Sequence, residues 1–230
     1  MRTVNHLFIS ALAAFLFLPM SSFAQLSAED ERIASRIVKE CKQWIFGATK
    51  PRTVIWPKQR FEEHPDRSYS LKSLVPKKFL QHEDQTWGVN LGWTDDATAQ
   101  TGAKVARWFF ARNGSAGGPI RYGETVALGN GQNPSFLKLE QRTVGINLSF
   151  SGSPAFEWKI LGGKIGDPVH TQELVVIFNE RSENGECLMY FDRTKGGDIG
   201  WPSSRTWSDQ VEGRLKEAVK KRILKEFGLD

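Results

Sequence analysis

Cysteine, histidine and excess charge are all scarce in this chain of 230 residues. There are two cysteines, Cys41 and Cys187, four histidines, and a formal net charge of +5. So small a positive balance indicates no particular partner. Beyond residue 24 the histidines are His64, His82 and His170, scattered without the spacing of metal ligands. We therefore expect them on the surface, and we predict neither a metal site nor a cofactor.

The motifs of common catalytic sites are missing as well. The chain has no G-x-S-x-G, no H-E-x-x-H and no phosphate-loop lysine. The glycine-rich stretch "GNGQN" at 129–133 lies between two predicted strands, which indicates a hairpin turn and not a phosphate-binding loop. Adjacent carboxylates such as Asp95 and Asp96 lie in polar stretches and are better explained as solvated than as acid–base pairs. We predict that the protein is not an enzyme.

Long apolar runs are also lacking, apart from one at residues 7–19. This run follows Arg2 and precedes small residues at Ser22 and Ala24, a pattern typical of a signal peptide spanning residues 1–24. The alternative is a membrane anchor, although the run is shorter than the roughly 20 residues that a span needs. We predict a secreted or periplasmic protein, for which so little excess charge makes nucleic acid an unexpected partner.

If the protein is exported, its two cysteines can be expected to meet an oxidising environment. An even cysteine count in an exported chain predicts a disulfide, here between Cys41 and Cys187. Two buried thiols are the alternative.

What the sequence does contain is an internal repeat. The hexapeptides "GVNLGW" (88–93), "GINLSF" (145–150) and "GGDIGW" (196–201) begin 57 and then 51 residues apart. A leucine lies eight residues before each initial glycine, and a large aromatic residue lies five residues after it. The leucines are Leu80, Leu137 and Leu188, and the aromatics are Trp93, Phe150 and Trp201. Self-similarity at such a period indicates a repeat architecture.

Each copy is predicted to hold four short strands. The strands upstream of the hexapeptide are "YSLKS", "TVALGN" and "VVIFN", and those downstream are "ARWFFAR" and "AFEWKIL" in the first two copies. Alternation with period two places Val89, Leu91 and Trp93 on one face. One copy cannot bury that face alone, so we expect the three copies to close around a shared core.

This pattern resembles the β-trefoil superfamily, and in particular its fascin-like and ricin-B-lectin-like members, over roughly residues 68–207. The stretch "IRYGETVALGNGQNPSFLKLE" resembles the first two strands of a trefoil unit, whereas the Q-x-W triplet of the ricin-B lectins is absent. The resemblance implies an all-β fold. It would have three pseudo-symmetric four-stranded units forming a six-stranded barrel capped by three hairpins.

Helices are predicted on both flanks of this β-trefoil domain, which we place at 51–207. An N-terminal helix is expected within 25–50, with an apolar stripe over 27–46, and a C-terminal amphipathic helix within 208–230. The third copy lacks a clear fourth strand. We predict that residues 54–56 of "TVIWPK" supply it and so close the barrel.

The resemblance to trefoil lectins also implies a function, recognition of a glycan or cell-surface polysaccharide. In those lectins the site lies around the third and fourth strands of a unit, with an acidic or amide side chain and an aromatic. The matching positions are Trp87, Asn90, Trp93, Asp95, Asn147 and Asp198. Of these we favour the first copy, where the loop at 94–104 follows Trp93. The alternatives are core packing for the aromatics and turn formation for the polar residues.

Two other functions remain open at this stage. Trefoils also serve as protein-binding inhibitors or effectors. A membrane-active, toxin-like protein is the third hypothesis, because the polar side of 209–230 is basic and such a helix can lie on anionic lipid. Docking of that helix on its own protein is the alternative.

Overall fold

The structure is a computed structural model, which describes residues 27–48, 68–101, 104–113, 119–131, 135–143, 145–181, 185–193, 197–202 and 209–229. The predicted signal peptide, residues 54–56 and His64 lie outside these ranges. Two helices are present, α1 (Ala28–Cys41) and α2 (Asp209–Phe227). The strands are β1 (Trp44–Ala48), β2 (Tyr69–Ser73), β3 (Phe79–His82), β4 (Leu91–Thr94), β5 (Gln100–Thr101), β6 (Lys104–Val105), β7 (Trp108–Arg112), β8 (Thr125–Asn130), β9 (Ser135–Leu139), β10 (Leu148–Ser151), β11 (Trp158–Leu161), β12 (Leu174–Asn179), β13 (Glu186–Tyr190) and β14 (Ile199–Gly200).

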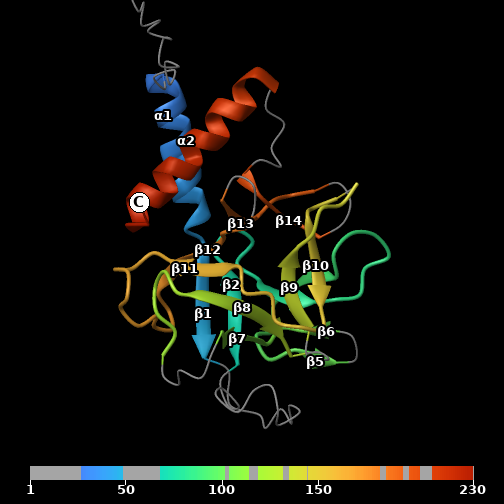
Figure 1. Ribbon diagram of the computed structural model, residues 1–230. Coiled ribbons are helices and arrows are strands. Elements are labelled where there is room, and N and C mark those ends of the chain that lie inside the picture. The colour runs from blue at the N-terminus through green and yellow to red at the C-terminus, as the bar shows by residue number, and fades with distance from the viewer. Residues whose placement is uncertain are drawn as a thin grey trace, which may run out of the picture.

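Six strands close into an antiparallel barrel. Their order is β1, β2, β7, β8, β11, β12 and back to β1, with antiparallel pairing at every step. Their inward side chains form the main core, in which Leu71, Val126 and Ile177 are fully buried. Closure leaves no edge among these six strands, which is how short strands of this kind avoid pairing with another chain. The prediction of an all-β fold is therefore confirmed at the level of a closed barrel with two helices (Figure 1).

Three hairpins extend from the barrel, and each contains one copy of the repeated hexapeptide. They are β3–β4, β9–β10 and β13–β14, which continue from β2, β8 and β12 respectively. The three leucines that we predicted to be equivalent, Leu80, Leu137 and Leu188, are fully buried.

A tryptophan at the start of a barrel strand ties each hairpin to the barrel. The indole Nε1 of Trp44, Trp108 and Trp158 donates to the carbonyl oxygen of Leu188, Leu80 and Leu137 at 2.7, 2.8 and 2.7 Å. Each indole also stacks on the aromatic ring that ends a hexapeptide: Trp44 on Trp93, Trp108 on Phe150 and Trp158 on Trp201, at centroid distances of 6.0, 6.5 and 6.1 Å. The same hydrogen bond and the same stack therefore occur three times.

The N-terminal helix ends earlier than the sequence pattern predicted. It stops at Cys41, Lys42 has a non-helical ψ of 74°, and β1 follows directly. The apolar residues of 27–46 fit a helical stripe, but the aromatic pair Trp44 and Phe46 prefers a strand and fills the barrel. In consequence β1 pairs with both β12 and β2 and so closes the barrel, whereas residues 54–56, for which we predicted this role, lie outside the described residues.

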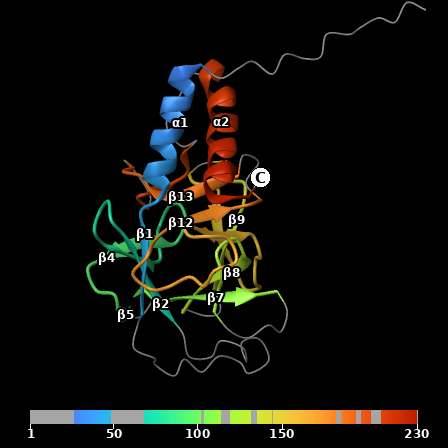
Figure 2. The same cartoon turned by 90° about the vertical axis from the view of Figure 1, so that its left-hand side faces the viewer.

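The two helices pack side by side against one end of the barrel, as both views show (Figures 1 and 2). The helix α1 begins with a capping box, in which Ser27 and Asp30 satisfy each other's backbone N–H groups. Its inner face packs with α2 and β12 in a second core cluster, which contains Ile37, Phe178, Ile223 and Phe227 among others.

A disulfide joins this helical layer to the β13–β14 hairpin. As predicted, Cys41 at the end of α1 is bonded to Cys187 on β13, with their Cα atoms 5.9 Å apart. His82 differs from expectation, because it lies on β3 with only 7% of its surface exposed and contacts the ring of Phe150 edge-on. In the described part of the chain, neither helix combines the length and apolar character needed to cross a membrane.

Candidate functional site

Three turns, at the tips of the three hairpins, form the candidate site. Their described residues are 83–90, 140–143 with 145–147, and 191–193 with 197–198, and we call them the hub turns. The last residue of each turn is an asparagine or aspartate, and its side-chain oxygen accepts a hydrogen bond from the backbone N–H five residues earlier. The bonds run from Gln85 to Asn90, from Arg142 to Asn147 and from Arg193 to Asp198, at 3.2, 3.0 and 3.2 Å. Three of the predicted ligand-binding residues thus form the turns, the alternative that turn chemistry offered.

The donor residue of each turn makes a second, side-chain bond across its hairpin. Gln85 Nε2 donates to the carbonyl of Leu91 at 3.4 Å. A guanidinium does the same in the other two turns: Arg142 Nη1 bonds the carbonyl of Leu148 at 3.2 Å, and Arg193 Nη1 that of Ile199 at 3.4 Å. The same bond is therefore made by glutamine in the first hub turn and by arginine in the second and third.

Glycine allows the hub turns to bend and approach one another. Gly88 and Gly145 have φ values of +94° and +98°, in the left-handed region that side chains disfavour. At Gly197, a Cβ atom would lie 2.7 Å from the carbonyl oxygen of Leu91, closer than any side chain permits. The turn of the third copy thus lies directly against the hairpin of the first.

An open pocket of about 860 Å³ lies among the three turns, and we call it the hub pocket. Its apolar lining includes Val89 and Ile146, both of which are buried. Trp87 also lines the pocket and exposes 80% of its surface, the most of any large apolar side chain in the described residues. An indole left in water beside a cavity is an available stacking surface, since a packed one would be covered.

Two positive charges line the hub pocket. Among the described residues of its lining, Arg142 and Arg193 carry a charge and none is a carboxylate. The described residues offer each guanidinium one main-chain acceptor and no ion-pair partner. A guanidinium has five N–H donors, so most of its donor capacity remains for a ligand.

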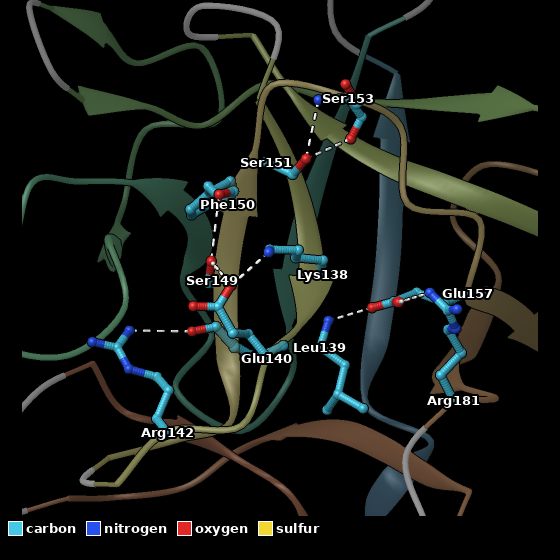
Figure 3. Close-up of polar contacts among 11 residues, drawn as sticks. Lys138, Leu139, Glu140, Arg142, Ser149, Phe150, Ser151, Ser153, Glu157 and Arg181 are labelled. Carbon is cyan, nitrogen blue, oxygen red and sulfur yellow. Dashed lines mark hydrogen bonds and ion pairs between the residues drawn. The ribbon is translucent and has the colours of Figure 1, made fainter.

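Glu140 interacts electrostatically with Arg142 but is engaged by other groups. Glu140 accepts a hydrogen bond from Ser149 at 3.0 Å and forms an ion pair with Lys138, as Figure 3 shows. The pKa of Glu140 is lowered, chiefly by the hydrogen bond from Lys138 and then by that from Ser149. Glu140 therefore stays ionised and is held by Lys138 of β9 and Ser149 of β10.

The remaining predicted site residues do not join Trp87 at the hub pocket. Trp93 packs between Trp44 and Tyr190, with ring centroids 6.0 and 5.5 Å away. Asp95 is exposed and lies 3.7 Å from the ammonium of Lys78. The sequence reasoning missed Arg142 and Arg193, although aligning the three copies three residues before each hexapeptide would have placed both beside Gln85.

Outside the hub pocket, three other features of the described residues bear on a possible site. A second cavity, of about 60 Å³, opens at the barrel end lined by Phe46, Tyr69 and Phe110. Burial and a hydrogen bond to Glu173 raise the pKa of Tyr122, which keeps that phenol neutral. Among the residues described, no group of three or more His, Cys, Asp or Glu side chains is arranged to hold a metal ion.

Comparison with known proteins adds no relative. No protein-family model, no curated protein and no solved structure matches the chain.

Proposed function

We propose that this chain is an exported β-trefoil, secreted or periplasmic, that binds a carbohydrate at the hub pocket and does not act as a catalyst. The observation that carries the proposal is Trp87, an exposed indole at the edge of a pocket of about 860 Å³ that also holds two guanidinium groups. A pyranose ring offers an apolar face for stacking and hydroxyl groups for hydrogen bonds, which an indole and arginines complement.

The threefold recurrence of the indole–leucine bond and the aromatic stack supports the trefoil part of the proposal. The closed six-stranded barrel and the three hairpins are what that fold requires. A rigid scaffold that presents three turns around one pocket is a common way of positioning a binding site.

A glycan array with two variants tests the proposed site. Wild type should bind a set of glycans, Trp87→Ala should lose them, and Asp95→Ala should retain them because Asp95 lies outside the hub pocket. We expect affinities from roughly micromolar to millimolar for one such site. If wild type binds no glycan, the proposal fails. If Asp95→Ala loses glycan binding and Trp87→Ala retains it, the binding site lies at the loop 94–104 and not at the hub pocket.

Protein binding is the second candidate, and the β2–β3 turn favours it. Leu74 and Val75 expose 42% and 58% of their surface there, as two adjacent apolar side chains. The membrane-active alternative has less support, since Val219, Ile223 and Phe227 of α2 pack against the protein itself.

A further inference from the structure

The two arginines of the hub pocket exceed what the fold requires. In the first hub turn, Gln85 makes the bond to the carbonyl across the hairpin that Arg142 and Arg193 make in the other two. An uncharged amide is therefore sufficient for this structural role. Among the described residues neither Arg142 nor Arg193 forms an ion pair, and the charge of Arg142 acts on Glu140 only at longer range, as the smallest of the influences on the pKa of Glu140.

The main-chain bond holds each guanidinium in place. Arg142 Nη1 and Arg193 Nη1 are fixed on carbonyl oxygens of β10 and β14, so their orientation is set before a ligand arrives. A pre-oriented guanidinium loses less rotational freedom on binding, and its planar fork matches the two oxygens of a carboxylate or the oxygens of a sulfate or phosphate.

The polarity around these groups favours an anion. The lining residues that the structure describes include two cations and no carboxylate, and the nearby Glu140 is engaged by Lys138 and Ser149. Val89 and Ile146 contribute apolar atoms to the lining. Trp87 adds a flat surface for a ring.

We infer that the hub pocket binds an acidic saccharide, whose ring stacks on Trp87 while its carboxylate, sulfate or phosphate group is held by Arg142 and Arg193. This inference rests on the proposed carbohydrate-binding function and specifies its ligand. A neutral sugar would leave both guanidinium groups without a charge partner.

The test is an array of acidic glycans of several ring types, each beside its carboxyl-reduced or desulfated counterpart. Uronate-only and sulfate-only glycans are included, so that the source of the oxyanion is identified. Wild type should bind the acidic members of the pairs and bind their neutral counterparts at least about tenfold more weakly, since a hydrogen bond to a charged group differs from a neutral one by this order.

The decisive variant is the double substitution Arg142→Gln and Arg193→Gln, which copies the side chain that the first hub turn already uses. It should melt as wild type does, bind acidic glycans about 10- to 100-fold more weakly and bind neutral ones unchanged. Its matched control is Arg32→Gln with Arg36→Gln, which removes the same charge from exposed positions on α1 and should not alter binding. Binding of wild type should also weaken as salt rises, because these charges are solvent-accessible.

The possible failures are distinguishable. If neutral and acidic glycans bind equally, or if the hub variant binds acidic glycans as wild type does, the inference is overturned while the proposed function stands. Equal weakening by the α1 control overturns it too, because net charge alone would then explain the binding. If no glycan binds at all, the proposed function and the inference fall together.

Discussion

The strongest test of the fold is a single tryptophan, Trp158, changed to phenylalanine. Its indole is fully buried, stacks on Trp201 at an interplanar angle of 15°, and donates Nε1–H to the carbonyl of Leu137 at 2.7 Å. Phenylalanine keeps a flat ring for the stack but removes the donor. The substitution therefore isolates the bond by which a barrel strand is tied to its hairpin.

The expected loss has two parts. Leaving a buried carbonyl without this donor costs about 1–3 kcal/mol, and the smaller ring removes apolar contact worth roughly 1–2 kcal/mol. The sum is about 2–5 kcal/mol. For a protein of this size, each kcal/mol lowers the melting temperature by about 2–4 °C. We thus expect a fall of roughly 4–20 °C.

Thermal unfolding followed by circular dichroism measures this fall, and Trp87→Phe is the matched control. Trp87 is the same residue type at an exposed position, so its replacement should change stability by no more than about 0.5 kcal/mol. Trp44→Phe and Trp108→Phe should resemble Trp158→Phe, because all three indoles make the same bond and stack. A wild-type melting temperature for Trp158→Phe, or an equal loss for Trp87→Phe, would refute the reasoning.

Three further outcomes are expected. Leu137→Ala, at a fully buried site, should cost about 2–5 kcal/mol in urea unfolding, and a cost below 1 kcal/mol would contradict its place in the core. Changing Cys41 and Cys187 together to serine should cost up to about 5 kcal/mol for so long a loop, and thiol titration of denatured, unreduced wild type should find no free thiol. Removing 209–230 should lower the melting temperature, because α2 covers part of the second core cluster; an unchanged value would show that the helix does not stabilise the barrel.

The strands of the repeat could be predicted because local pattern and long-range spacing agree there. The alternation of Val89 and Leu91 with polar residues defines one buried face, and the structure buries both side chains. The leucine eight residues before each hexapeptide could be predicted for the same reason, because its occurrence at the same place in three copies indicates one equivalent structural position. The buried side chains of the hairpins can therefore be predicted from the local sequence pattern and the repeat.

The strand β1 could not be placed so easily. Both "WIFGA" at 44–48 and "TVIWPK" at 53–58 combine aromatic and β-branched residues, and the first also continues a helical apolar stripe. What selects β1 is tertiary: Trp44 takes the position that Trp108 and Trp158 occupy, and its Nε1 meets the carbonyl of Leu188, 144 residues away. A pairing over that distance leaves no local signal.

The candidate site shows what the recurring polar residues of the repeat do in the fold. Asn90, Asn147 and Asp198 match the acidic or amide position of the trefoil-lectin site, but they also recur in all three copies, as residues that every copy needs to fold do. Each accepts the backbone N–H that shapes its turn. They are therefore accounted for before any ligand is considered.

A ligand that lies among three turns meets all of them at once, so its contacts are expected where the copies differ. The donor position of the hub turn holds Gln85 in the first copy and arginine in the other two. The position before the first glycine holds Trp87 in the first copy, and Val144 and Lys195 at the corresponding places in the sequence. Both departures occur in turns whose backbone bonds stay the same, so neither is required to form the turn. In a repeat protein of this kind, the symmetric residues identify the scaffold, and the asymmetric residues that line a pocket are the ones to substitute first.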